Sequence, residues 1–182
     1  RSWLRAGAVL ATVTACAGVQ AQCDDWEPLG TGANNSVFAS IEWDGELVIG
    51  GNFTQIHDLL ANRIALWNGV SWEPLGSGLN GQVTSLAIYE GDLVACGAFT
   101  TAGGISAFRV ARWDGAEWSA FGDGLNSTVH AVSPYGPDLI VGGQFNASGS
   151  TAVSYVARWD GSTWQPMADG FNSYVRALTV HE

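Results

Sequence analysis

The hydrophobic residues of this chain recur in short alternating runs separated by glycine-rich turns, and the whole pattern repeats every 46 residues. The clearest markers of the period are the tryptophans Trp26, Trp72, Trp118 and Trp164, the tryptophans Trp67, Trp113 and Trp159, and the phenylalanines Phe53, Phe99 and Phe145. A fixed period of this length is typical of proteins that use one supersecondary unit several times. The repeat therefore dominates any prediction of the fold.

The second repeat shows the predicted strands most clearly, because its apolar and polar residues alternate over four short runs. These runs cover residues 83–89, 93–99, 109–113 and 117–122. The turn at residues 90–92 joins the first two runs, and a longer loop rich in glycine and alanine, residues 100–107, joins the second to the third. Each repeat thus predicts a sheet of four antiparallel strands, and the predicted fold class is all-β.

The third and fourth runs of each repeat are joined by the dipeptides Asn68-Gly69, Asp114-Gly115 and Asp160-Gly161. Such dipeptides are strong hairpin signals and predict type I′ turns, in which both central residues have positive φ. A two-residue loop would set Trp67 opposite Val70, whereas a four-residue loop would set Trp67 directly opposite Trp72. Under both alternatives the two indoles lie on one face, so each sheet presents an apolar slab.

A single four-stranded unit with apolar residues on both faces would leave half of its apolar surface in water. Neighbouring units must therefore cover it. Units stacked face to face around an axis form a β-propeller, in which each sheet is one blade. A linear solenoid is the alternative, but solenoid coils are usually shorter and do not use four antiparallel strands. The sequence accordingly predicts a β-propeller.

The period predicts blades at about residues 31–76, 77–122 and 123–168, and a partial blade at residues 169–182 whose first strand covers residues 175–181. Residues 25–30 have the pattern of the fourth strand of a preceding blade. Closure of a propeller usually requires about four to eight blades. We therefore expect an incomplete propeller of about three and a half blades, and we interpret the chain as a fragment of a longer polypeptide.

The first 21 residues differ in composition from the repeats. Arg1 and Arg5 precede an apolar run over residues 6–19, which is too short to span a bilayer, and small residues suited to cleavage follow it. We interpret residues 1–21 as a signal peptide and expect a secreted or cell-surface protein. The alternatives are an apolar element of the mature fold and a lipoprotein signal, in which Cys16 would be acylated.

The chain carries 17 acidic residues against seven arginines and no lysine, with a net charge of −10 at pH 7. This balance argues against a nucleic-acid partner and against binding to an anionic membrane surface, since both depend on cationic contacts. We expect no membrane association beyond the lipid anchor of the alternative leader. Cys96 stands where Gly50 and Gly142 stand in the other repeats, so we expect a small buried side chain rather than a disulfide with Cys23.

Catalytic and metal-binding patterns are missing from the sequence. His57, His130 and His181 fall at unrelated phases of the repeat, whereas metal sites need convergent ligands. The hairpin at residues 159–164 resembles the Asp box of sialidases but lacks one residue of it, and a structural turn explains it. We therefore expect no catalytic residue, no metal and no cofactor.

A repeated asparagine follows each glycine-rich turn, at Asn34, Asn80, Asn126 and Asn172. Its amide can bond the backbone, so we expect it to brace the loop that joins one blade to the next. A ring of ligand-binding asparagines is the alternative.

The motif G-x-L-V-x-G-G-x-F-T, followed by I/V-A-R-W-D-G-x-x-W and P-L-G-x-G-L-N, resembles kelch-like propeller repeats of secreted bacterial proteins. It is also similar to the ectodomain repeats of fungal cortical marker proteins for polarised growth. The resemblance covers residues 26–182 and implies a propeller, but it implies almost nothing about activity. In the first repeat, Asp58, Leu59 and Leu60 replace the glycines of the long loop, so that loop should differ in shape.

In a propeller, the loops between second and third strands and those between blades emerge on the same rim. The candidate binding residues there, which vary from repeat to repeat, are His57, Asp58, Arg63, Phe108, Arg109 and Tyr155. Rims with mixed aromatic and charged residues suit protein or glycan partners. We expect a non-enzymatic protein-binding module. A lectin-like glycan-binding propeller is the alternative, and a non-catalytic part of a larger secreted enzyme is a further one.

Overall fold

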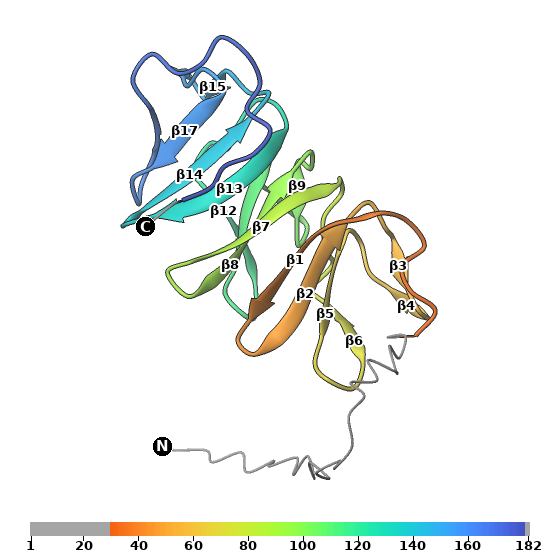
Figure 1. Ribbon diagram of the computed structural model, residues 1–182. Coiled ribbons are helices and arrows are strands. Elements are labelled where there is room, and N and C mark those ends of the chain that lie inside the picture. Colours follow the sequence, from red (N-terminus) through yellow and green to blue (C-terminus); the bar gives the residue numbers. More distant parts are fainter. Residues whose placement is uncertain (1–29, 181–182) are drawn as a thin grey trace, which may run out of the picture.

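A computed structural model describes residues 30–180, and within this range the ordered elements are all β-strands (Figure 1). Those residues include no helix that is long and apolar enough to cross a membrane. The predicted signal peptide at residues 1–21 and nearly all of the predicted strand at residues 25–30 lie outside the described residues. The all-β prediction is confirmed.

Three four-stranded antiparallel sheets follow one another along the chain, and each takes its strands from one repeat. Blade 1 has the order β1 (Val37–Trp43), β2 (Glu46–Gly51), β5 (Ile64–Trp67) and β6 (Trp72–Pro74). Blade 2 has the order β7 (Val83–Tyr89), β8 (Asp92–Gly97), β11 (Val110–Trp113) and β12 (Trp118–Ala120). Blade 3 has the order β13 (Val129–Tyr135), β14 (Asp138–Gly143), β17 (Val156–Trp159) and β18 (Trp164–Pro166). The arrangement is that of a partial β-propeller, as predicted.

The long loop of each repeat, predicted without strands, folds into a small two-stranded hairpin. The three hairpins are β3 (Gln55–Ile56) with β4 (Leu59–Leu60), β9 (Thr101–Ala102) with β10 (Ile105–Ser106), and β15 (Ala147–Ser148) with β16 (Thr151–Ala152). Single bridges from Ala33 to Ile56 and from Leu79 to Ala102 tie two of the hairpins to the segments that lead into β1 and β7. We call the edge formed by these hairpins and segments the loop rim.

The prediction of type I′ turns between third and fourth strands is wrong. Trp67 pairs directly with Trp72, so the loop has four residues, and Gly69 has positive φ whereas Asn68 does not. The reason is that the Asn68 side-chain oxygen accepts hydrogen bonds from the backbone N–H groups of Val70 and Ser71, which closes the wider loop. Blades 2 and 3 share this arrangement, with the pairs Trp113–Trp118 and Trp159–Trp164. Type I′ geometry, with positive φ at both residues, occurs instead at Asp44-Gly45 and Glu90-Gly91.

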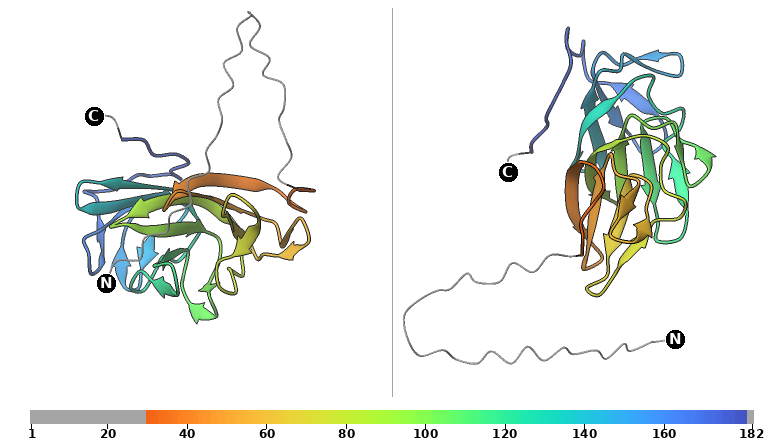
Figure 2. Two further views of the ribbon diagram at one scale, coloured as in Figure 1. Left: turned by 90° about the horizontal axis from the view of Figure 1, so that it is seen from below. Right: turned by 90° about the vertical axis from the view of Figure 1, so that its right-hand side faces the viewer.

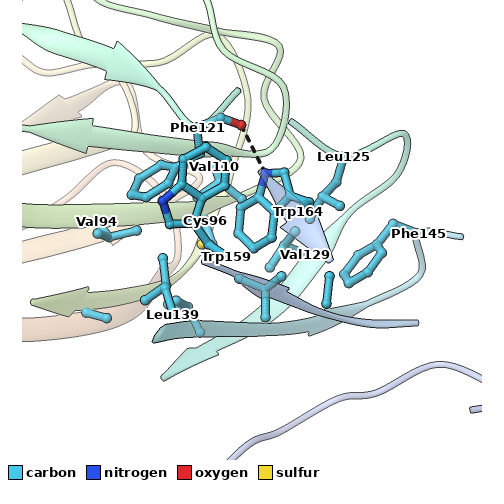
Figure 3. Close-up of a cluster of buried hydrophobic side chains, with 14 of the residues drawn as sticks. Val94, Cys96, Val110, Phe121, Leu125, Val129, Leu139, Phe145, Trp159 and Trp164 are labelled. Atoms are coloured by element: carbon cyan, nitrogen blue, oxygen red, sulfur yellow. Dashed lines mark hydrogen bonds between the residues drawn. The ribbon is translucent and has the colours of Figure 1, made fainter. Parts of the chain in front are cut away.

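The blades pack face to face through the apolar slabs. The indoles of Trp113 and Trp118 share a buried cluster with Ile64 and Leu66 of blade 1, and Trp118 Nε1 donates a hydrogen bond of 2.9 Å to the carbonyl of Leu75, which follows β6. The same contact recurs one blade later, where Trp164 Nε1 lies 2.9 Å from the Phe121 carbonyl (Figure 3). The prediction that neighbouring units cover each other is thereby confirmed.

The first strands, β1, β7 and β13, lie side by side, and the C-terminal segment runs past blade 3 (Figures 1 and 2). The first strand predicted at residues 175–181 does not form over residues 175–180, which have no strand assignment. A strand needs a ladder partner, and no described residue supplies a second strand to this segment.

Candidate functional site

An asparagine that recurs in each repeat forms hydrogen bonds with the backbone of the loop rim. Asn80 Oδ1 accepts hydrogen bonds of 2.8 and 3.0 Å from the backbone N–H groups of Thr100 and Thr101, and its Nδ2 donates to Thr100 Oγ1. Asn34 and Asn126 make the equivalent bonds in blades 1 and 3. The predicted bracing role holds for these three asparagines, but the braced loop is the one after the second strand rather than the one between blades.

The candidate arginines of the rim are also engaged with the backbone. Arg63 Nη1 donates to the carbonyl and side-chain oxygens of Asn52, and Arg109 Nη1 donates to the carbonyls of Ala98 and Phe99. Both arginines have positive φ, 70° and 72°, and both are half-buried. Their guanidinium groups therefore hold the start of the long loop and offer little to a partner.

His57 and Asp58 occupy the tip of the first hairpin. Both are exposed, His57 Nε2 lies 3.3 Å from Asp58 Oδ2, and His57 Nδ1 lies 3.3 Å from the backbone nitrogen of Thr31. Together with Trp67 and Trp72 they line an open pocket of about 480 Å³ at the outer face of blade 1. In blades 2 and 3 the corresponding tryptophans contact the preceding blade, so this pocket is the blade-packing surface of the first unit.

Phe108 and Tyr155 present aromatic surface on blades 2 and 3. The Phe108 side chain is 47% exposed at the loop rim. The Tyr155 ring lies 5.6 Å from the ring of Tyr174, with the planes inclined by 62°, and Tyr174 is 53% exposed. The two tyrosines form an edge-to-face pair.

The six candidate residues do not converge on one cavity. His57 and Asp58 line the pocket on blade 1, whereas Arg63 lines a separate groove of about 290 Å³ between blades 1 and 2 with Asn80 and Thr101. The exposed members, His57, Asp58 and Phe108, lie on blades 1 and 2, and the half-buried Tyr155 lies on blade 3. This arrangement suits an extended contact surface better than a small enclosed site.

No group of three histidine, cysteine or carboxylate side chains that could hold a metal ion occurs within residues 30–180. His57 pairs with one carboxylate only. His130 lies on β13, where burial and the nearby charge of Arg176 lower the pKa of its imidazole. The described residues therefore bring no histidines together.

The opposite edge of the blades, which we call the turn rim, carries the β1–β2, β7–β8 and β13–β14 turns and the loops between third and fourth strands. It is rich in carboxylates, and its two arginines are paired: Arg112 with Asp92 and Glu90, and Arg158 with Asp138. Backbone N–H groups of Thr163 and Ser162 bond Asp160 and hold the pKa of its carboxyl well below the usual range. Asp160 therefore stabilises its own loop, whereas Glu90, Asp92 and Asp138 pair with arginines.

A protein-family model, described as the Rax2 C-terminal beta propeller domain, matches residues 25–181. The chain belongs to this family. The match confirms the predicted resemblance to repeats of fungal polarised-growth markers and agrees with the propeller seen in the described residues. A search of curated proteins gives no match.

Two solved structures of designed proteins are similar to this member of the Rax2 propeller family. The computationally designed Ika4 protein has a TM-score of 0.55 and 16% identity, and the match covers 86% of this chain and 88% of that chain. The computationally designed Ika8 protein has a TM-score of 0.53 and 16% identity, and the match covers 84% of this chain but 42% of that chain. At this identity the likeness shows the fold alone.

Three aromatic or apolar residues of blade 3 and its C-terminal extension were missed by the sequence reasoning about binding. Tyr174 pairs with Tyr155, and Met167 and Phe171 are 37% and 58% exposed. The available signal was the repeat itself, since Met167 and Phe171 stand at positions that hold apolar residues in every blade. A position that is apolar in every repeat is predicted to lie in the core, but it is buried only where a following blade covers it.

Proposed function

We propose that this propeller module binds another protein through the loop rim and has no enzymatic activity of its own. The proposal is supported by a contrast between two kinds of residue on the loop rim: those that recur in each blade and those that differ between blades. Bracing residues such as Asn80 recur in each blade, whereas none of the positions with exposed apolar side chains holds a large apolar residue in all three blades. Leu60 is 77% exposed on β4, Ile105 is 42% exposed on β10, and Phe108 is 47% exposed.

Exposed apolar residues spread over successive hairpins fit a protein partner better than a sugar. Protein interfaces place apolar anchors within a broad patch, and those anchors provide most of the binding energy. A lectin that used each blade in turn would need the same aromatic and polar residues in each blade. The positions equivalent to Phe108 are Asn62 and Ser154, which do not repeat its aromatic ring.

Glycan binding is the second candidate, and the pair formed by Tyr155 and Tyr174 favours it. A half-exposed pair of rings offers a flat apolar face with polar edges, which suits stacking against a sugar ring. This pair occurs on one blade, so it would form a single site rather than a ring of sites.

We further propose that the protein acts outside the cytoplasm, either secreted or at the cell surface. The leader-like residues 1–21 support this location, together with membership of the Rax2 propeller family. Catalytic work by other parts of a larger secreted enzyme is compatible with the same module.

Site-specific photo-crosslinking tests the protein-binding proposal. A photoreactive phenylalanine analogue is placed at Phe108 and, as a matched control, at the exposed turn-rim residue Ala116, in cells that produce the protein. We expect a discrete protein adduct at position 108 that disappears in the Leu60→Ser/Ile105→Ser variant, and no adduct at position 116. Adducts of equal yield at both positions, or none at position 108, would contradict the proposal.

A glycan array separates the second candidate from the first. Sugar binding that is retained in Leu60→Ser/Ile105→Ser but lost in Tyr155→Ala would assign function to the tyrosine pair. Absence of sugar binding would leave that pair without a ligand role.

A further inference from the structure

The loop that joins β5 to β6 carries the dipeptide Asn68-Gly69 on the turn rim. Asn68 is half-buried and Gly69 is exposed, and no described atom lies within 4 Å of the place that a Cβ on Gly69 would take. The equivalent dipeptides of blades 2 and 3 stay exposed although a blade precedes each of them: Asp114-Gly115 and Asp160-Gly161. The exposure of this loop therefore does not depend on the uncovered face of blade 1.

The amide of Asn68 is polarised by hydrogen bonds within its own hairpin. Its Oδ1 accepts bonds of 2.9 Å from the backbone N–H groups of Val70 and Ser71, and its Nδ2 donates to Glu73 Oε1. Two N–H donors on one oxygen stabilise negative charge that develops there, as an oxyanion hole does. Within residues 30–180 the N–H of Gly69 donates to no acceptor. The side-chain carbonyl carbon is thus activated, and the next backbone nitrogen is free.

We propose that Asn68 is a site of spontaneous deamidation, in which the backbone nitrogen of Gly69 attacks the side-chain carbonyl carbon. The new C–N bond closes a succinimide ring, and Nδ2 leaves as ammonia together with the proton of the Gly69 amide. Water then opens the ring at either carbonyl and leaves aspartate or isoaspartate at position 68. The balance is one water consumed and one ammonia released. Glycine permits the attack because no side chain hinders its nitrogen.

The other Asn-Gly dipeptide of the sequence, Asn80-Gly81, is a matched comparison. Asn80 Oδ1 accepts bonds from the N–H groups of Thr100 and Thr101, which lie in a different loop, and its Nδ2 donates to Thr100 Oγ1 at 2.8 Å. A Cβ on Gly81 would lie 2.8 Å from the carbonyl oxygen of Ala98. Ring closure would break these bonds and move the close-packed backbone. Asn80 should therefore react about tenfold or more slowly than Asn68 in the folded protein.

The product would place a charge where blade 1 has no partner for it. Asp114 and Asp160 hold this position in blades 2 and 3, and the uncharged residues Ser119 and Gln165 stand there at the position of Glu73. In blade 1 the Asn68 amide donates to Glu73 instead. Deamidation replaces that donor with a carboxylate, and the two like charges repel each other. The reaction therefore weakens the β5–β6 hairpin. This consequence concerns the turn rim and is independent of binding at the loop rim.

Peptide mapping of the full chain tests the site. The folded protein is incubated in mildly alkaline buffer, and the deamidated forms of both dipeptides are followed over time by chromatography and mass spectrometry. We expect aspartate and isoaspartate to accumulate at position 68, at a rate that rises with pH, while Asn80 changes little. In urea both dipeptides should react at similar rates, because the hydrogen bonds that distinguish them are lost.

Two sets of variants separate the reaction from its consequence. Gly69→Asn adds a side chain to the attacking residue and should slow the reaction at Asn68, while the positive φ is still tolerated. Asn68→Asp reproduces one product and should lower the melting temperature. Asn68→Asp/Glu73→Gln removes the repulsion and should restore most of that loss, whereas Glu73→Gln alone should change it little. The difference between these variants measures the coupling of the two side chains.

Three results would overturn the proposal. The first is equal deamidation of Asn68 and Asn80 in the folded protein. The second is an unchanged Asn68 in the folded chain under conditions in which the unfolded chain reacts. The third is a melting temperature of Asn68→Asp that equals the parent value, because the modification would then have no effect on the hairpin.

Discussion

At the scale of single residues, the polar side chains that recur from repeat to repeat form hydrogen bonds with the backbone of their own blade. Asn34, Asn80 and Asn126 accept hydrogen bonds from the N–H groups that begin the long loop, and Arg63 and Arg109 donate to backbone carbonyls beside it. Loops usually leave such groups to water, and here fixed partners hold three hairpins in position. Binding specificity is then left to the side chains that vary.

Asn80→Ala should destabilise blade 2. The substitution leaves the N–H groups of Thr100 and Thr101 without their acceptor, so we expect a loss of about 1–3 kcal/mol in the free energy of unfolding. Asn80→Asp keeps the acceptor oxygen and should lose less. Urea denaturation of both variants measures the difference, and equal stability of Asn80→Ala and the parent would contradict the bracing role.

Asp160 should stabilise the folded protein to an extent that depends on pH. Its carboxyl accepts N–H bonds from Ser162 and Thr163 at 3.0 and 2.9 Å, and these lower its pKa in the folded protein. A lowered folded-state pKa stabilises above the unfolded pKa of about 4 and loses its effect as the pH falls below it. The parent should therefore melt above Asp160→Asn at pH 6, and the gap should narrow as the pH is lowered below about 4. A constant gap would be inconsistent with this role.

At the scale of the element, close approach of backbones decides which residues the strands can hold. A Cβ at Gly97 would lie 1.9 Å from the carbonyl oxygen of Gln82, on the segment that enters β7. The irregular register between Val83 and Ser85 lies opposite this point. The glycine is thus required for space, because its φ does not lie in the left-handed region.

Gly97→Val should be strongly destabilising, since the backbone of β7 would have to move away from β8. We expect a loss of at least about 1–3 kcal/mol in the free energy of unfolding, the usual cost of overpacking. Gly69→Asn is the control, because nothing lies within 4 Å of that position and asparagine tolerates its φ of 90°. Thermal melts in which both variants matched the parent would show that the close approach is absent.

The paired tryptophans offer a test of blade packing with an internal control. Trp113 is 8% exposed between blades 1 and 2, so Trp113→Ala should cost about 3–5 kcal/mol in the free energy of unfolding. Trp67 has the same place in blade 1, at the outer face, and is half-buried. Trp67→Ala should cost clearly less. Chemical denaturation compares the two, and equal losses would contradict a packing role that depends on the neighbouring blade.

The strands of each blade could be predicted because the alternation of apolar and polar residues, the turn residues and the tryptophan pairs all recur in each repeat. The loop closed by Asn68 was mispredicted, since a side-chain acceptor replaced the type I′ backbone turn. The role of Arg63 could not be predicted either, because a long side chain can reach solvent or fold back onto the backbone, and the local sequence does not decide between these two arrangements. Exposure of Phe171 depends on a neighbouring blade, which a local pattern does not report.

At the scale of the whole molecule, stability comes from stacking rather than from any one sheet. Two of the three buried clusters of residues 30–180 draw residues from adjacent blades, and the third lies within blade 1, so most of the core forms only when the blades stack. Cys96 belongs to the cluster between blades 2 and 3 and is fully buried and free. Burial raises the pKa of its thiol well above the usual range. This thiol therefore reports separation of the two blades.

Labelling of Cys96 by a thiol reagent should be very slow in the folded protein and should accelerate in step with unfolding in urea. The thiolate is the reactive form, and both its low population and the cover of blade 3 protect it. Peptide mapping by mass spectrometry separates this site from Cys16 and Cys23, and a cysteine introduced at the exposed residue Ala116 gives the rate for a free thiol. Rapid labelling of Cys96 without denaturant would mean that blades 2 and 3 part readily, and the stacked arrangement would then not be the stable state of the chain.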